Sequence, residues 1–242
     1  AKTPSSLEKI SSFGWLQLTV IVGITGILLL SVLNTRKADV FYARGSVAAN
    51  QQLWEQALEN LTAAVTLAPQ EAQYSDTLAL TYAQAATAIG LTGDATSASQ
   101  LAITAVELSD RTLQLNPEQR NFYKTRAQIF ITLAQLEPPL LAQAKEALEQ
   151  ELELAPTDAK TMYNLGILSA NQGDAEGTIE WLRRAIEFKP NYDAARWELS
   201  KQLLQQEKYD AAITELEYIL TRDPSNQAAQ ELLDATHSQQ KL

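Results

Sequence analysis

The sequence contains no cysteine and one histidine, and it is poor in glycine (9), proline (8) and aromatic residues (7% of 242). The absence of cysteine excludes disulfides and thiolate metal sites. The scarcity of glycine and proline argues against all-β and disordered chains. The chain is instead rich in alanine, leucine, glutamine and glutamate, a composition typical of stacked helices. We therefore expect an all-α protein.

The motifs of the common catalytic sites are also missing. No Gly-rich phosphate loop, paired metal ligands or Ser/His/Asp arrangement occurs, and the single His237 lies in a polar C-terminal stretch. We therefore expect no enzymatic activity, no cofactor and no metal site. The carboxylates Glu146, Glu149, Glu151 and Glu153 recur at helical spacing. We interpret them as a solvated helix face.

The charge is unevenly distributed. Residues 1–37 carry four basic residues and one acidic residue, a balance of +3, so the rest of the chain carries −13 of the net −10. An acidic body repels phosphate backbones, which makes nucleic acid an unsuitable partner. The basic residues near the N-terminus would attract anionic lipid head groups, by about 1 kcal/mol each.

One long apolar run indicates a membrane anchor. No residue between Lys9 and Arg36 is charged, and residues 13–33 read FGWLQLTVIVGITGILLLSVL. As a helix these 21 residues would span about 32 Å, which matches the hydrocarbon core of a bilayer. The run predicts a transmembrane helix at 13–33 after a polar tail at 1–12, and a single-pass membrane protein. A cleavable signal peptide is disfavoured, since its apolar region would be shorter and an A-x-A-like site would follow.

Three residues of this run have a specific role in the anchor hypothesis. Trp15 lies where an interfacial aromatic belongs, and Gly23 and Gly26 would permit the close approach of a partner helix. The basic residues on the two sides are nearly balanced, so the side of the membrane stays open. The link at 34–37 holds neither glycine nor proline, so we expect the anchor to continue into the next helix.

Prolines close five helix-like segments, and the last three, Pro156, Pro190 and Pro224, are each 34 residues apart. A fixed period of 34 residues indicates stacked helical hairpins. The fourth unit, with Leu165-Gly166 followed by GDAEGTIEWLRRAIEFKP, resembles the tetratricopeptide repeat, and so do the first and fifth units. The resemblance covers residues 38–226 and implies a superhelical solenoid of protein-binding hairpins.

On this resemblance the array divides into five units, at 38–71, 72–119, 120–158, 159–192 and 193–226, with a capping helix and tail at 227–242. The 48 residues between Pro69 and Pro117 imply an insertion of about 14 around residues 89–97. Such insertions lengthen the turn between two helices or the helices that lead into it.

The resemblance also implies a binding groove, lined by the first helix of each unit. Projected onto this chain, its protein-binding residues are Tyr42, Asp76, Asn121, Lys124, Gln128, Lys160, Tyr163, Asn164, Trp197 and Lys201. The tyrosines and Trp197 are rigid anchors of the kind that form binding hot spots, although packing between repeats explains them equally well. The three lysines would suit an acidic or C-terminal segment of a partner.

These features favour a membrane-anchored scaffold that mediates protein–protein interaction, as a structural or assembly subunit of a larger membrane protein complex. One alternative is a translocon- or quality-control-associated chaperone, which single-span bacterial repeat proteins often are. Another is the C-terminal regulatory tail of an O-antigen-ligase-like membrane protein, whose last membrane helix and following repeats the run KADVFYARG…LWEQALENLTAAVTLAP resembles. The shortness of the chain argues against the tail.

Overall fold

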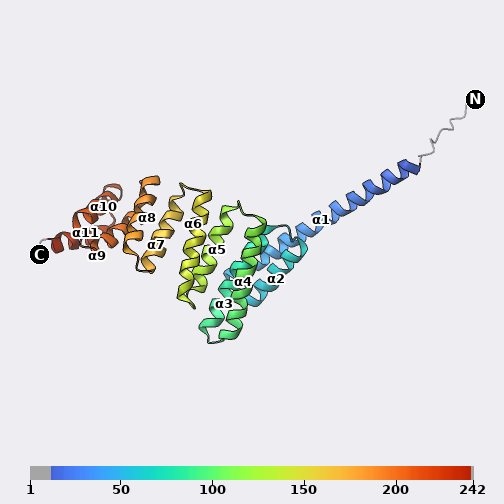
Figure 1. Ribbon diagram of the computed structural model, residues 1–242, viewed down its shortest axis with the longest axis horizontal. Helices are drawn as coiled ribbons and strands as arrows, with labels where there is room; N and C mark the ends of the chain where they lie inside the picture. Colours follow the sequence, from blue (N-terminus) through green and yellow to red (C-terminus); the bar gives the residue numbers. More distant parts are fainter. Residues whose placement is uncertain (1–11, 241–242) are drawn as a thin grey trace, which may run out of the picture. The chain divides into compact units, whose positions relative to one another are not determined.

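The structure is a computed structural model that describes residues 12–240, with side-chain burial from residue 17 onward. Every regular element in this part of the chain is a helix, which confirms the expected all-α fold (Figure 1). The elements are α1 (Ser12–Asn50), α2 (Trp54–Leu67), α3 (Ala72–Leu91), α4 (Ala95–Leu115), α5 (Arg120–Leu133), the 3-10 turn η1 (Pro138–Leu140), α6 (Leu141–Leu154), α7 (Ala159–Asn171), α8 (Ala175–Phe188), α9 (Asp193–Gln205), α10 (Tyr209–Arg222) and α11 (Gln227–Gln240).

The chain divides inside α3 into two compact units, residues 1–81 and 82–242. Each unit has its own core. In the first unit Ala38, Ala64, Ala68 and Tyr74 form a small buried cluster. In the second unit a larger cluster runs from α5 to α10 and a smaller one joins α10 to α11.

Helix α1 dominates the first unit. It runs without a break through residues 34–37, as the absence of glycine and proline there predicts. Its second half forms a hairpin with α2, and its first half extends beyond that hairpin (Figure 1). The two helices approach closely because Gly45 has no side chain: an added Cβ would lie 2.7 Å from Leu61 Cγ.

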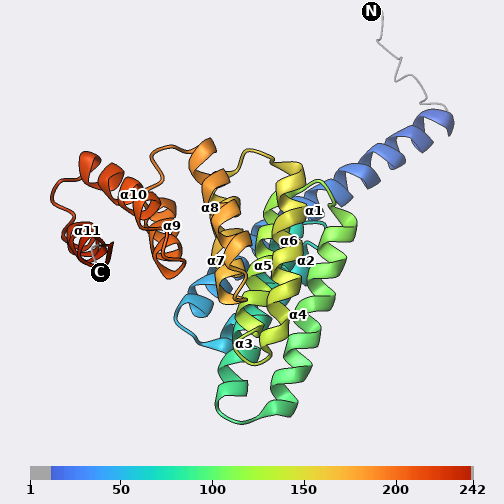
Figure 2. The ribbon, with the colours of Figure 1, turned by 60° about the vertical axis from the view of Figure 1, so that its left-hand side comes forward.

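The second unit consists of helical hairpins stacked in chain order. The pairs α5/α6, α7/α8 and α9/α10 pack together, each pair contacts the next, and α11 packs on α10 (Figure 2). One such hairpin is too small to bury its apolar face alone, so stacking is what produces the continuous core. Helix α11 covers the last hairpin at the stretch where a capping helix is expected.

The insertion predicted near residues 89–97 lies in two helices. Helices α7 and α8 have 13 and 14 residues, whereas α3 and α4 have 20 and 21. Each of the latter is therefore longer by 7 residues, and together they account for all 14 additional residues.

Candidate protein-binding groove

The residues expected to line a groove come from the first helices of successive hairpins. In the second unit α5 carries Asn121, Lys124 and Gln128, α7 carries Lys160, Tyr163 and Asn164, and α9 carries Trp197 and Lys201. Tyr42 on α1 and Asp76 on α3 belong to the first unit.

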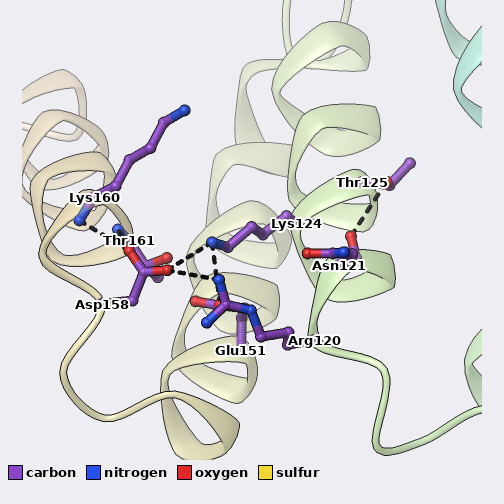
Figure 3. A network of polar contacts seen from close by, with 8 residues as sticks. All are labelled: Arg120, Asn121, Lys124, Thr125, Glu151, Asp158, Lys160 and Thr161. Carbon is purple, nitrogen blue, oxygen red and sulfur yellow. Dashed lines mark hydrogen bonds and ion pairs between the residues drawn. The ribbon is translucent and has the colours of Figure 1, made fainter.

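Lys124 forms part of a polar network between three helices (Figure 3). Its ammonium lies 2.8 Å from Asp158 Oδ2 and 3.3 Å from Glu151 Oε1. Arg120 supports the same two carboxylates, at 3.1 Å from Asp158 Oδ2 and 3.7 Å from Glu151 Oε1. Lys124 is thus held by the protein's own acids, which weakens its expected role as a free cation for a partner.

Glu151 corrects one expectation from the sequence. Its side chain on α6 is fully buried (0% exposed), whereas Glu146, Glu149 and Glu153 are exposed. Neither carboxylate oxygen of Glu151 has a hydrogen bond in the described part of the chain. The interpretation of all four glutamates as a solvated face is therefore wrong for Glu151. Its charge is balanced by the two cations of α5, which helical spacing within α6 does not reveal.

Asp158 connects this network to α7. Its carboxylate accepts hydrogen bonds from the backbone N–H groups of Lys160 and Thr161, and so caps the N-terminus of the helix. Burial on its own would raise the pKa of Asp158. The hydrogen bonds from Lys124 and from the backbone of Thr161 outweigh burial and hold that pKa below its usual range.

Tyr163 lies in an aromatic pair rather than alone. Its ring centroid lies 5.2 Å from that of Tyr192, and the Lys189 ammonium lies 4.3 Å from the centroid of the Tyr192 ring. Both tyrosines pack half-buried against the main core cluster. Burial raises the pKa of Tyr163, and the negative charge of Glu198 adds to that effect. Tyr163 therefore presents one ring edge to solvent and anchors the repeat stack with the rest.

Trp197 and Lys201 lie on α9. Trp197 is half-buried and packs against the cluster formed by α10 and α11, so packing between repeats accounts for part of its surface. The ammonium of Lys201 pairs with Glu198 at 2.7 Å on the same helix. Lys160 differs from both: its side chain is exposed, has no ion pair among the described residues, and points away from the network in Figure 3.

Tyr42 and Asp76 have partners in the structure. The Tyr42 ring lies 4.9 Å from that of Tyr74, and its hydroxyl lies 3.2 Å from Thr77 Oγ1. Tyr74 donates a hydrogen bond to Asp39, and burial together with this bond raises the pKa of Tyr74 to about 12. Asp76 is buried and has partners of its own. These residues stabilise the first unit.

The anchor residues lie on α1. The stretch Gln17–Asn50 is long and apolar enough to cross a membrane, judged by length and composition. Its apolar side chains are exposed, and a Cβ added at Gly23 or Gly26 would meet nothing within 4 Å. Trp15 is part of the helix, but its side chain lies outside the described residues.

The residues that remain accessible define what the groove offers a partner. Asn121, Gln128 and Lys160 are exposed, and Tyr163, Asn164, Trp197 and Lys201 are half-buried. Sequence reasoning missed Arg120, Asp158 and Tyr192, because their partners are distant along the chain. The described residues contain no group of three acidic or histidine side chains arranged for a metal ion.

Solved structures share this fold at low sequence identity. The PilF protein of Pseudomonas aeruginosa is 14% identical, with a TM-score of 0.58 over 86% of this chain and 92% of its own. MamA from Desulfovibrio magneticus RS-1 is 17% identical, with a TM-score of 0.57 over 79% and 97%. YrrB, described as a TPR protein with an unusual peptide-binding site, is 16% identical, with a TM-score of 0.53 over 79% and 89%.

Sequence comparison agrees with the fold. None of the curated proteins matches this chain, but residues 141–193 match the family model of the tetratricopeptide repeat. The matched segment consists of α6, α7 and α8, which include the Gly166–Leu182 contact and the Asp174 cap. The chain is thus a member of the tetratricopeptide-repeat family.

Proposed function

We propose that this protein is a membrane-anchored scaffold that docks onto a larger membrane protein complex as a structural or assembly subunit. Tetratricopeptide arrays bind other proteins, and the fold supports that role here. The membrane and the complex are the further steps of this proposal.

The observation that carries the proposal is the continuity of α1. One helix joins an apolar stretch, whose side chains pack against nothing in the described chain, to the first hairpin of the array. Side chains such as Ile27 (69% exposed) and Leu30 (62% exposed) need an apolar environment that the protein does not supply. A bilayer supplies it and holds the array at the membrane surface.

The groove provides the binding surface in this proposal. Lys160, Asn121 and Gln128 offer polar contacts, and the exposed parts of Tyr163 and Trp197 offer rigid apolar ones. With Lys124 and Lys201 paired internally, Lys160 is the cation most available to an acidic segment of the partner. No catalytic role is assigned to any of these residues.

The anchor is tested by charge. Ile27→Lys combined with Leu30→Lys would place two ammonium groups in the bilayer, at a cost of about 5–7 kcal/mol. The full chain should then move from the membrane fraction to the alkaline-carbonate extract. Leu91→Lys with Leu115→Lys is the matched control, because Leu91 (67%) and Leu115 (69%) are as exposed but lie in the array. Equal retention of both variants would refute the anchor.

The complex is tested by co-purification from native membranes in mild detergent. A stoichiometric partner set that is lost with Lys160→Glu/Tyr163→Ala would support the scaffold. Migration of the chain alone would refute it, and a broad, substoichiometric set of clients would favour the chaperone alternative.

A further inference from the structure

The two elongated helices create a surface that the regular hairpins lack. Seven extra residues are close to two helical turns, so α4 keeps the same face towards its neighbours to within about 20°. It also extends about 10 Å farther than a 14-residue helix such as α8. In both ribbon views the α3–α4 turn lies beyond the ends of α5 and α6 (Figure 2).

An apolar furrow of about 650 Å³ lies along this extension. Its floor is one stripe of α4, in which Ala95, Ala98, Ala102 and Val106 recur every three or four residues with Ser99 and Ile103 beside them. The opposite wall comes from the end of α5 and the turn after it, through Leu133, Leu136 and Leu140. Gly90 closes the base, because Leu136 packs where its side chain would be.

The furrow is open to solvent and apolar at once. Ile103 is 49% exposed and Leu136 is 38% exposed, although α4 and α5 both bury apolar residues elsewhere. Small side chains at Ala95, Ala98 and Ala102 leave room for a second backbone to come close to α4, and helices pack at distances set by such residues. The stripe from residue 95 to residue 106 covers about 16 Å, the length of three helical turns.

The charges at the furrow have one sign. Its only charged lining residues are Glu107 and Glu137, both exposed. Neither carboxylate takes part in an ion pair within the described residues, whereas Asp110, one turn along α4, is paired with Arg126. Two unneutralised carboxylates beside an apolar floor complement a ligand that is apolar on one face and basic at its edges.

We propose that this furrow is a docking site for an amphipathic helix of a partner protein, apolar on one face and flanked by lysine or arginine. An open three-turn stripe with small floor residues fits a helix, which lays its apolar face into such a groove by i, i+3, i+4 and i+7 anchors. A small-molecule pocket would add convergent polar groups that fix orientation, and here Ser99 is the single uncharged polar side chain in the lining. The site is separate from the groove of the first helices, and the proposal depends on neither that groove nor the anchor.

The test is a selection of displayed 14-residue helices of randomised sequence against the full chain in mild detergent. The expected winners have an apolar i, i+3, i+4, i+7 stripe and net positive charge. Their affinity should fall at least tenfold with Ala102→Phe, which fills the floor, and with Ile103→Asp, which makes the wall polar. Glu107→Lys/Glu137→Lys should reverse the charge preference. Leu115→Phe is the matched control on the same helix, and its affinity should equal that of the wild type.

Circular dichroism of each variant separates lost binding from lost folding, and Ile103→Asp changes a half-exposed residue that the fold tolerates. Winners that are acidic, that bind as extended segments, or that bind Ala102→Phe and Ile103→Asp as tightly as the wild type would overturn the proposal. A concentration-dependent dimer lost with Ile103→Asp would assign the furrow to a second copy and would overturn it as well.

Discussion

The hairpin of α7 and α8 and the extended hairpin that ends in α4 are built on the same turn. Gly93-Asp94-Ala95 and Gly173-Asp174-Ala175 share a glycine at positive φ, followed by an aspartate whose carboxylate caps the next helix. The same Gly–Ala backbone hydrogen bond of 3.1 Å closes both turns. What differs is the distance from the turn to the rest of the array, which is two helical turns longer in α4.

This comparison separates local from tertiary control. The turn depends on a few adjacent residues and forms wherever they occur. Whether the helix beside it is covered depends on whether a neighbour reaches that far. Near the turn, α7 meets buried Leu182 at Gly166, whereas Gly90 meets half-exposed Leu136 and leaves a furrow open. Moving one turn outward by two helical turns therefore produces new surface without new turn chemistry.

The largest expected effect concerns the charged network of α5 and α6, which contrasts with the unpaired acids of the furrow. Lys124→Met should lower the free energy of unfolding by about 3 kcal/mol, because it leaves the buried Glu151 carboxylate with Arg120 alone. Adding Glu151→Met should restore most of this loss. Glu137→Gln, at an exposed unpaired acid, should change stability by less than about 0.5 kcal/mol.

Urea unfolding of the full chain in detergent, followed by circular dichroism, measures these changes, and hydrogen exchange in α5 and α6 localises them. An equal effect of Lys124→Met and Glu137→Gln would show that the buried carboxylate needs no partner.

The next effect tests the close helix contacts of the two hairpins with one substitution. Gly166→Ala should cost about 2 kcal/mol, since its Cβ would lie 2.9 Å from Leu182 Cγ and that side chain is fully buried. Gly90→Ala should cost less than about 0.5 kcal/mol, since the contact is with the mobile end of a half-exposed leucine. Thermal unfolding of the two variants compares them directly, and the reverse order would contradict the difference in coverage.

The two turns should respond alike. Gly93 has φ of +101° and Gly173 has φ of +75°, a region that alanine adopts only with strain. Alanine at either position should cost about 1–2 kcal/mol. Proteolysis near each turn, compared with wild type, reports the local opening. A turn that accepted alanine freely would show that the two are not equivalent.

The smallest effect is on pH dependence. The pKa of Asp158 is lower in the folded protein than its ordinary value, so its ionised form stabilises the fold above that ordinary value. The contribution is lost as the pH falls through the folded pKa. Asp158→Asn should therefore be less stable than the wild type at neutral pH and equally stable in strong acid. A stability difference that did not change between pH 7 and pH 2 would mean that the charge of Asp158 is irrelevant.

Much of the fold follows from residues that are close in sequence. The 34-residue spacing of the prolines, the Leu165-Gly166 pair and the small residues at fixed positions predict helical hairpins because each hairpin needs the same local pattern to stack. The unbroken α1 follows from the absence of a helix breaker at 34–37. The insertion was predictable in length, but its equal division between α3 and α4 was not.

The sequence by itself determined the hairpin type, the turns and the apolar length of α1, because these depend on local pattern and on periodicity. The tertiary structure alone decided that Glu151 is buried beside Arg120 and Lys124, that Tyr163 pairs with Tyr192, and that the floor of α4 is left open. Those outcomes depend on which helices become neighbours and on how far each extends. Burial, charge pairing and exposed apolar surface are properties of that arrangement, and no single helix encodes them.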